Sequence, residues 1–432
     1  FTSTRHKDFT RLKKPLAIIG SGISGLSAAY FLKHQFDVTL FEKNDRLGGH
    51  SRTISITNPK NQKIDVDTGF IVLNDRNYPN LNKLFKHLKV EIVKTDMTFS
   101  VSVNQGALEW SGTSIDGFFA QRKNLLNLHM LKGIVDIFTF NKKVLKCLEE
   151  FPQQTLGQFI DSLGLGTWFR DYYILPMGGA IWSCPYSKIL EFPAITFINF
   201  FNNHGLLTIN DRPQWYTLKN KSRSYVQAIE QAISPHVKIV KSAIIDCISR
   251  TDHGVDVAVR GQNTKNFDEV IFSCHPTEIL KFLKDPSPLE RKTLSKFSNQ
   301  KNVVYTHRDE NLMPKRRKCW SSWNYLLNKN DHNQDVCVTY WMNGLQHIDK
   351  SSPVFVSLNP NITIDEDKIY DICEFSHPVF DRSAIDAQEE IHKIQGSNKL
   401  WFCGAYLKYG FHEDGISSAI NVVSTMGKDL LW

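Results

Sequence analysis

Short runs of apolar residues and a segment with helical spacing alternate at the start of the chain. Residues 15–19 (Pro-Leu-Ala-Ile-Ile) form an apolar run typical of a strand that is buried on both faces. Residues 26–32 then place apolar side chains at helical spacing, and residues 37–41 form a second apolar run that ends at Glu42. The pattern predicts a strand, a helix and a second strand, in that order.

Further runs of the same kind occur far along the chain. Residues 236–245 and 269–273 are predicted to be strands. Residues 400–403 are predicted to be a buried strand that meets Gly404, with a helix beginning near residues 414–415. Strands that alternate with helices in this way predict an α/β fold.

A longer amphipathic pattern covers residues 118–148, which are predicted to be largely helical. Apolar side chains recur there at spacings of three or four, and lysines are interspersed among them. The apolar set is Leu125, Leu128, Leu131, Ile134, Val135 and Phe138, and the lysines are Lys123, Lys132, Lys142, Lys143 and Lys146. Two interpretations fit this pattern: a pair of helices that pack their apolar side on the core, or a basic amphipathic surface that lies on a membrane.

Length and charge narrow the class of protein. The chain has 432 residues, which exceeds the length at which one hydrophobic core keeps growing, so two lobes are expected. The net charge of +8 is partly local, because Arg5, Lys7 and Arg11 crowd the N-terminus. The sequence contains no apolar stretch long enough to predict a spanning helix. It also contains no module of the kinds that predict nucleic-acid binding.

The cysteine and histidine usage predicts no metal site. The eight cysteines are scattered, without a CxxC pair or a zinc-ligand spacing, which fits reduced thiols in a cytoplasmic protein. Membrane association of such a protein is left open. His412, Glu413 and Asp414 stand together, but their spacing fits no standard metal motif. Asp414 is expected to cap a helix instead. The chain begins with Phe rather than Met, which is compatible with a processed N-terminus.

The turn between the first strand and the first helix carries a glycine-rich motif. Gly20, Gly22 and Gly25 form a GxGxxG pattern, with a strand before it, a helix after it and Glu42 at the end of the second strand. Gly20 permits the tight turn, Gly22 lets a pyrophosphate approach the backbone, and Gly25 allows close packing of helix and strand. Glu42 is placed to accept hydrogen bonds from ribose hydroxyls, which disfavours NADP. The motif alone admits NAD as well as FAD.

The residues that follow separate these two cofactors. Residues 42–53 resemble the extended signature of the flavin amine oxidase and phytoene desaturase superfamily. The residues that carry the resemblance are Glu42, Lys43, Arg46, Gly48 and Gly49. The resemblance implies FAD as the cofactor, with the paired glycines letting the backbone pass close to it. His50 stands where those families often carry Arg and is expected to make a different contact.

Two further segments resemble the same superfamily. Residues 65–70 look like the strand and turn that lie against the flavin ring, and residues 400–427 look like the segment whose helix N-terminus faces the flavin C2 carbonyl. The resemblance implies cofactor contacts from Ser24, Thr68, Gly69, Phe70, Ala243, Gly404, Ala405, Asp414, Gly415 and Ile416. The acid that usually follows Gly404 is replaced by Ala405, so other groups must complete the contacts there.

The resemblance also implies a discontinuous division of the chain. A Rossmann-like, GR2-type FAD-binding lobe is expected from residues 14–95, 215–275 and 395–432. An interleaved α+β substrate lobe is expected from residues 96–214 and 276–394. The oligomeric state is left open.

Segments of both lobes resemble one bacterial family of FAD-dependent oxidoreductases. The similarity covers about residues 12–427, and the matching segments include 66–72, 175–183, 200–207, 320–325 and 409–415. One branch of that family is described as methylated-fatty-acid desaturases of furan fatty acid synthesis (UfaD-like). The resemblance implies a methyl-branched, unsaturated fatty acyl chain as substrate, free or in a phospholipid, and a possible peripheral membrane contact.

The implied reaction is a dehydrogenation, in which flavin N5 takes a hydride from an allylic carbon and a base takes the neighbouring proton. His204 is the first candidate for the base, because an unperturbed imidazole is poised near neutral pH. Tyr406 and Tyr409 are candidates to shape or polarise the substrate, and a structural role stays open for all three residues. Other interpretations are a redox-neutral fatty-acid isomerase, an amine oxidase, and a non-catalytic flavin-binding partner of a lipid-modifying enzyme.

Overall fold

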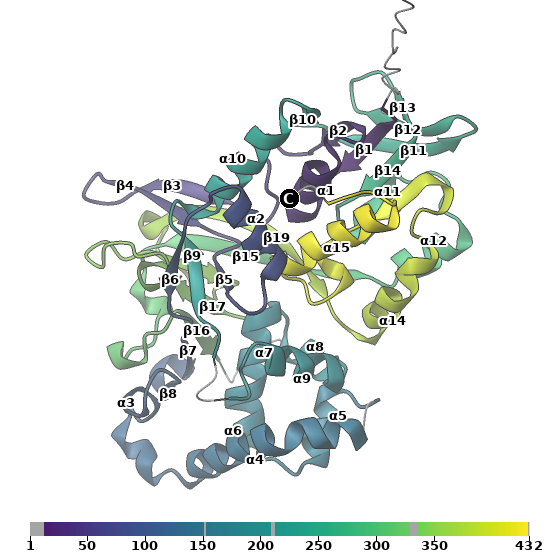
Figure 1. Ribbon diagram of the computed structural model, residues 1–432. Coiled ribbons are helices and arrows are strands. Elements are labelled where there is room, and N and C mark those ends of the chain that lie inside the picture. Colours follow the sequence, from purple (N-terminus) through teal and green to yellow (C-terminus); the bar gives the residue numbers. More distant parts are fainter. Residues whose placement is uncertain (1–12, 151–152, 209–211, 329–335, 431) are drawn as a thin grey trace, which may run out of the picture.

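The computed structural model describes residues 13–150, 153–208, 212–328, 336–430 and 432, without side chains for residues 147–150. The basic residues Arg5, Lys7 and Arg11 lie outside the described residues. Figure 1 shows a parallel sheet flanked by helices in the upper part of the view, a mixed sheet beside it, and a group of helices at the foot. The predicted α/β fold class is confirmed.

The parallel sheet contains strands from three distant parts of the chain. In spatial order they are β10 (Val237–Val240), β2 (Asp37–Phe41), β1 (Pro15–Ile19), β14 (Glu269–Phe272) and β20 (Leu400–Phe402). All four neighbouring pairs are parallel, and the register places Ile19 between Phe41 and Phe272. The apolar runs at residues 15–19 and 37–41 are therefore buried on both faces, as their composition predicts.

One predicted strand is shorter than expected. Residues 236–245 were expected to form a continuous strand, but β10 ends at Val240 and a new strand begins at Ile245. Ser242 lies between them with a left-handed backbone at φ 52°. The apolar run therefore contains a turn, which feeds a small antiparallel sheet. Its strands are β11 (Ile245–Thr251), β12 (Gly254–Val259) and β13 (Lys265–Phe267).

Helices cover the parallel sheet. All ten residues of α1 (Ile23–Leu32) are buried, because α15 (His412–Thr425) and α10 (Lys221–Ile233) both pack on it. Near them lie α2 (Pro79–His87), α11 (Pro276–Phe282), α12 (Pro288–Leu294) and α14 (Arg382–Glu390). A helix that is apolar all round, such as α1, is stable only in such a buried position.

The second large sheet has seven strands and mixed directions. In spatial order they are β19 (Ile369–Val379), β15 (Ser298–His307), β18 (Phe355–Leu358), β17 (Val338–Trp341), β16 (Trp323–Leu327), β7 (Phe99–Val103) and β8 (Leu108–Ser111). The smaller strands are β3 (Thr53–Thr57), β4 (Lys63–Asp67), β5 (Val72–Asn74), β6 (Ile92–Thr95) and β9 (Trp215–Leu218). Strands β5 and β6 each pair with β9, which lies between them, and β3 pairs with β4.

The helices at the foot of Figure 1 pack around an aromatic core. They are α3 (Ile115–Phe118), α4 (Leu128–Glu150), α5 (Leu156–Ser162), α6 (Thr167–Phe169), α7 (Leu175–Trp182), α8 (Tyr186–Glu191) and α9 (Ala194–Asn203), with a short α13 (Met342–Leu345) in the sheet region. Phe140 and Val144 of α4 are buried in this core. Other apolar residues of α4, including Val135 and Phe138, are exposed. The expectation that α4 packs its apolar residues on the core is therefore only partly correct.

Candidate functional site

The glycine-rich turn between β1 and α1 is packed tightly at two of its three glycines. A Cβ atom at Gly25 would lie 1.9 Å from the carbonyl oxygen of Gly20, and one at Gly20 would lie 2.9 Å from the Ser273 carbonyl oxygen. A Cβ atom at Gly22, in contrast, would meet nothing within 4 Å. Protein packing therefore explains Gly20 and Gly25 but not Gly22. The space beside Gly22 suits a ligand that approaches the backbone, as a dinucleotide pyrophosphate does.

The paired glycines of the second motif pack directly on this turn. The Gly48 N–H donates a hydrogen bond of 2.9 Å to the Ser21 carbonyl, and a Cβ atom at Gly49 would lie 3.0 Å from the Gly22 Cα atom. Both residues have positive φ, at 105° and 57°, which favours glycine. The Arg46 guanidinium donates to the Gly49 carbonyl at 2.9 Å, so within this structure it holds the loop together.

Glu42 is buried and its carboxylate is fixed by hydrogen bonds from both sides. One oxygen accepts from the backbone and hydroxyl of Ser21, at 3.0 and 2.6 Å, and the other accepts from the backbone and amide of Asn44, at 2.9 and 2.8 Å. The Ala243 N–H donates to the Glu42 carbonyl at 2.8 Å, which places Ala243 next to this acid. Lys43 is exposed and pairs with Glu278 at 2.7 Å. The side chain of Lys43 therefore points away from Glu42.

The N-terminal turns of α1 and α15 meet. A Cβ atom at Gly415 would lie 2.6 Å from Ile23 and 3.0 Å from the Ser24 hydroxyl, so the contact requires glycine there. Ile416 is fully buried behind it. The first N–H groups of a helix lack acceptors within the helix and favour negative charge. Two helix N-termini that converge in this way fit the pyrophosphate and the flavin end of FAD.

The acids at the start of α15 cap helices. Asp414 accepts hydrogen bonds from the backbone N–H groups of Phe411 and Tyr409, at 2.9 and 3.2 Å, and burial raises its pKa to about 6. Glu413 accepts from the backbone N–H of Leu81, at 3.0 Å, at the start of α2. The expectation that Asp414 caps a helix agrees with this geometry. No group of histidine, cysteine and acidic side chains within the described part of the chain could hold a metal ion.

The strand end at Gly404 leads into a tight turn. The Gly404 N–H donates to the Ser418 hydroxyl of α15 at 2.9 Å, and the Ala405 carbonyl accepts from the Gly410 N–H at 3.1 Å. Tyr406 folds back over Gly404 and packs edge-on against Phe297. Its buried hydroxyl has no hydrogen-bond partner among the described residues.

Residues 67–70 lie against His50. A Cβ atom at Gly69 would lie 1.9 Å from the His50 carbonyl oxygen, and the Thr68 N–H donates to the Arg52 carbonyl at 2.9 Å. Phe70 stacks on His412 with ring centroids 3.7 Å apart. The turn predicted to face the flavin is therefore joined to both the paired-glycine loop and the start of α15.

His50 belongs to a group of histidines that sequence reasoning did not recognise. Its ring stacks on Phe375 at 4.9 Å and lies 5.4 Å from the His377 ring and 6.0 Å from the His275 ring. Burial lowers the pKa of His377 to about 4 and lowers the pKa values of His50 and His275 in the same direction. His275 and His377 each precede a proline near the end of a strand. No other local feature of the sequence marks them as members of this group.

In the sequence, His412 stands out only as a candidate metal ligand. Its Nε2 atom lies 2.8 Å from the Ser51 hydroxyl and 3.2 Å from the Tyr225 hydroxyl, and the two hydroxyls are themselves hydrogen-bonded. Burial lowers the pKa of His412 to about 3, so the imidazole is neutral at pH 7. This side chain therefore joins the paired-glycine loop, α10 and α15.

The proposed base His204 lies at the C-terminal end of α9 among aromatic rings. It stacks on Phe200 at 3.8 Å and lies 6.0 Å from Phe411, and the Phe200 ring also contacts Tyr409 at 5.7 Å. We define the aromatic wall as His204, Phe200, Phe411 and Tyr409. Tyr406 packs elsewhere, so the structure brings together two of the three predicted catalytic residues.

The imidazole of His204 differs from the unperturbed group that was expected. Burial lowers its pKa to about 4. Its Nδ1 atom lies 2.9 Å from the Phe200 carbonyl oxygen, which selects the neutral tautomer with a proton on Nδ1. Nε2 is then an acceptor. No residue that the structure describes donates a hydrogen bond to Nε2.

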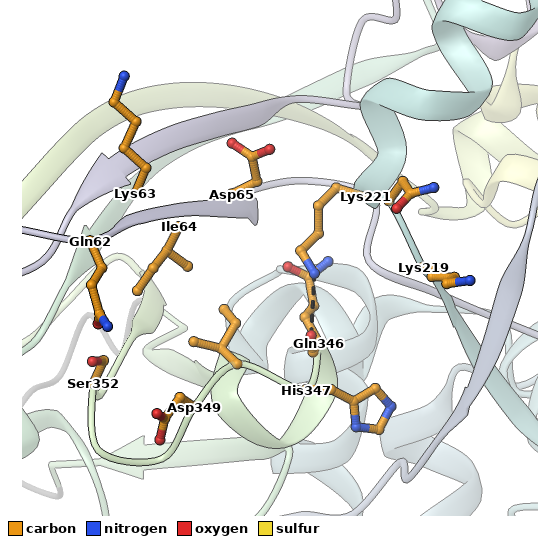
Figure 2. A pocket seen from close by; sticks show the side chains of 12 residues that line it. Gln62, Lys63, Ile64, Asp65, Lys219, Lys221, Gln346, His347, Asp349 and Ser352 are labelled. Atoms are coloured by element: carbon orange, nitrogen blue, oxygen red, sulfur yellow. Dashed lines mark hydrogen bonds between the residues drawn. The ribbon is translucent and has the colours of Figure 1, made fainter.

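A polar cavity of about 490 Å³ lies away from these residues, between the β3–β4 hairpin and residues 346–352. Figure 2 shows Lys221 beside Gln346 at its inner end, and the Lys221 ammonium donates to the Gln346 carbonyl at 3.2 Å. None of the predicted site residues lines this cavity.

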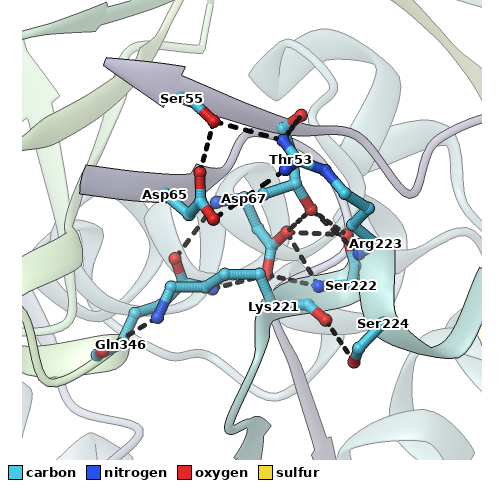
Figure 3. Close-up of polar contacts among 9 residues, drawn as sticks. All are labelled: Thr53, Ser55, Asp65, Asp67, Lys221, Ser222, Arg223, Ser224 and Gln346. Carbon is cyan, nitrogen blue, oxygen red and sulfur yellow. Dashed lines mark hydrogen bonds and ion pairs between the residues drawn. The ribbon is translucent and has the colours of Figure 1, made fainter. Parts of the chain in front are cut away.

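A buried carboxylate joins distant segments of the chain near this cavity. Asp67 accepts hydrogen bonds from the Ser222 backbone at 2.9 Å, the Thr53 hydroxyl at 2.6 Å and the Gln346 amide at 2.6 Å. Figure 3 shows that these groups come from two strands, from the start of α10 and from the segment that carries Gln346. Because Asp67 directly precedes Thr68, this network fixes the turn that lies on His50.

Comparisons with known proteins agree with this geometry. A family model described as an NAD(P)-binding Rossmann-like domain matches residues 18–88. The flavin-containing amine oxidase A of Canis lupus familiaris is 33% identical over 96 residues, which is 22% of this chain and 16% of that protein. The chain matches only 9% and 16% of the lengths of the curated relatives compared.

Solved structures share the fold over almost the whole chain. A protoporphyrinogen oxidase from Exiguobacterium sp. 255-15 has a TM-score of 0.64 at 13% identity, over 96% of this chain and 98% of its own. The fatty acid isomerase of P. acnes that produces CLA has a TM-score of 0.64 at 14% identity, over 95% of this chain and 98% of its own. These likenesses confirm the predicted fold. FAD as the predicted cofactor agrees with the match to a flavin-containing amine oxidase.

The contrast between two glycines predicts two different mutant phenotypes. Gly22→Ala adds a methyl group to open space, so the melting temperature without FAD should stay unchanged while FAD affinity falls at least tenfold. Gly25→Ala forces a clash with the Gly20 carbonyl and should lower stability by about 2–4 kcal/mol. Flavin titration and thermal unfolding of the FAD-free protein measure both effects. Equal FAD affinity of Gly22→Ala and the parent protein would contradict the assignment of Gly22.

The buried histidines predict loss of stability in acid. In the unfolded chain a histidine has a pKa of about 6.5, so between about pH 6.5 and 4 the unfolded chain binds protons that the folded protein excludes. Stability therefore falls as the pH falls through this window, by up to about 1.4 kcal/mol per pH unit for each such histidine. His412→Gln should reduce the slope by about one proton. Urea unfolding at several pH values, with excess FAD, measures the slopes.

Proposed function

We propose that the chain is an FAD-dependent oxidoreductase of the flavin amine oxidase and protoporphyrinogen oxidase-like superfamily, because it shares the fold of these proteins. We further propose that it desaturates an allylic position of a methyl-branched, unsaturated fatty acyl chain. The oxidoreductase class is supported by the open space beside Gly22 and by the buried carboxylate of Glu42. The substrate is supported by the resemblance of the sequence to methylated-fatty-acid desaturases and by the composition of the aromatic wall.

The aromatic wall is the observation that carries the substrate class. Phe200 and Phe411 stack at 5.0 Å, and the wall borders the start of α15, where Asp414 and Glu413 are engaged as caps. An amine substrate would favour a carboxylate that faces its ammonium group. These two carboxylates are engaged as caps and do not provide that contact. An apolar wall with a single neutral imidazole suits an acyl chain. The fold is also that of a fatty acid isomerase.

The residues of the chain can divide the reaction between them. FAD, when bound, supplies the hydride acceptor. His204 is neutral at pH 7 because of its low pKa, its Nδ1–H is held by Phe200, and Nε2 can accept the neighbouring proton of the substrate. The N-terminus of α15 stabilises negative charge that lies close to that end of the helix. The aromatic wall excludes water from the reacting carbons.

The first test is anaerobic mixing of the FAD-loaded protein with a methyl-branched, monounsaturated fatty acid, and separately with a phospholipid that carries it. The proposal expects the flavin to bleach and stay reduced, with a product that has lost two hydrogens by mass spectrometry. A flavin that returns to the oxidised state, with a product of unchanged mass, would favour the redox-neutral isomerase. No bleaching by either lipid, with tight binding to a lipid-modifying enzyme, would favour a non-catalytic partner.

His204 is tested by a variant that keeps its ring. His204→Phe preserves stacking on Phe200 but removes both nitrogens, so flavin reduction by the lipid should slow by at least about tenfold. FAD content and the melting temperature should stay close to those of the parent protein. The exposed His392→Phe serves as a matched control. Unchanged flavin reduction in His204→Phe would remove His204 from the proton transfer.

A further inference from the structure

The outer side of α4 carries a row of exposed apolar side chains. Leu128, Val135, Phe138 and Leu145 are 78%, 62%, 55% and 44% exposed. Their spacings of seven, three and seven residues place them along one side of the helix. The opposite side is anchored in the protein through Met130, Phe140 and Val144, which are buried. The exposed row is therefore a feature of a well-packed helix.

Apolar side chains continue beyond the N-terminal end of α4. Leu126 is 86% exposed and Ile115 is 82% exposed, and Leu125 is also exposed. We call this set, together with the exposed row of α4, the α4 surface. Single exposed apolar residues need no explanation, but a contiguous group of large ones indicates an interaction site.

The α4 surface is strongly basic. Five lysines are exposed on or beside it, and none of them forms an ion pair with a described residue; they are Lys123, Lys132, Lys142, Lys143 and Lys146. Asp136 is the only acid between residues 119 and 146. It is buried and accepts a hydrogen bond from the Gly166 N–H at 2.9 Å. The face presented to solvent thus combines apolar side chains with lysines that form no ion pair with a described side chain.

We propose that the α4 surface docks on an anionic lipid bilayer, with α4 lying in the plane of the interface. Apolar side chains enter the headgroup region while lysines contact lipid phosphates, which is the arrangement of interfacial amphipathic helices. No helix in the described ranges is long and apolar enough to cross a bilayer. In Figure 1 α4 is at the foot of the molecule, at the opposite end from the parallel sheet. Docking there leaves the cofactor lobe in water.

Charge selects the bilayer over a protein partner as the occupant. A second copy of this chain would bring five like-charged lysines against five others, which costs free energy. An anionic membrane instead compensates all of them at once and accepts the apolar row without shape complementarity. This inference does not depend on the proposed substrate, because it uses only the exposed face of α4.

Vesicle flotation of the FAD-loaded full chain tests the proposal. Vesicles of phosphatidylcholine mixed with phosphatidylglycerol should bind the protein at least about tenfold more tightly than pure phosphatidylcholine vesicles. Raising the salt concentration from about 0.1 M to about 0.5 M should weaken binding, because screening shortens the range of charge attraction. Equal binding to both vesicle types, or no binding to either, would overturn the proposal.

Two double variants separate the contributions. Val135→Ser with Phe138→Ser removes exposed apolar contact, and Lys132→Gln with Lys143→Gln removes charge; each should weaken binding by about tenfold. Thermal unfolding should be unchanged, because all four side chains point to solvent.

Matched controls are exposed residues elsewhere. Ile372→Ser changes an apolar side chain that is 53% exposed on β19. Lys281→Gln with Lys284→Gln removes two exposed lysines at the end of α11 and beyond it. Both controls should bind vesicles like the parent protein. Weakening by the controls as large as that by the α4 variants would overturn the proposal, as would a lipid-free dimer that α4 variants abolish without any vesicle binding.

Discussion

Everything in the candidate site depends on how closely backbone segments approach one another around the first glycine turn. Gly25 touches the carbonyl of Gly20, Gly49 touches Gly22, and Gly415 touches the start of α1. Each contact leaves no room for a side chain, so one turn, one loop and one helix end are held in fixed positions by packing within the protein. The open space beside Gly22 is what remains between them. A preorganised space of this kind lowers the entropy cost of binding a long, flexible cofactor.

The sequence predicted the cofactor half of the molecule well because its signals are local. The strand, turn and helix around Gly20 and the acid at Glu42 each follow from short-range patterns, and the strands pair as expected. The break at Ser242 was missed because an apolar run gives no sign of a left-handed residue within it. The hydrogen bond of Arg46 to Gly49 and the ion pair of Lys43 with Glu278 could not be predicted either, because both depend on the final geometry of the loop.

The buried histidines and the aromatic wall were harder to predict, because their residues gather from distant segments. His50 lies in the loop before β3, His275 follows β14 and His377 lies near the end of β19, and no spacing in the sequence links them. His204 and Tyr409 were each a candidate in the sequence, but only packing around Phe200 shows that they share one wall while Tyr406 does not. Amphipathic spacing in α4 identified a helix correctly, but the apolar residues that face outward could be recognised only once the inner side was seen to be filled by others.

The order of strands in the parallel sheet has a consequence for synthesis on the ribosome. Neighbouring strands β1, β14 and β20 begin at residues 15, 269 and 400, so the sheet gains its edge strand only when almost the whole chain has emerged. Until then β14 exposes an unpaired edge, and α1 lacks the cover of α15. The nascent chain must therefore carry one side of this apolar helix uncovered until α15 has been made. Apolar surface that stays exposed for so long during synthesis is prone to aggregate and is a site for chaperones.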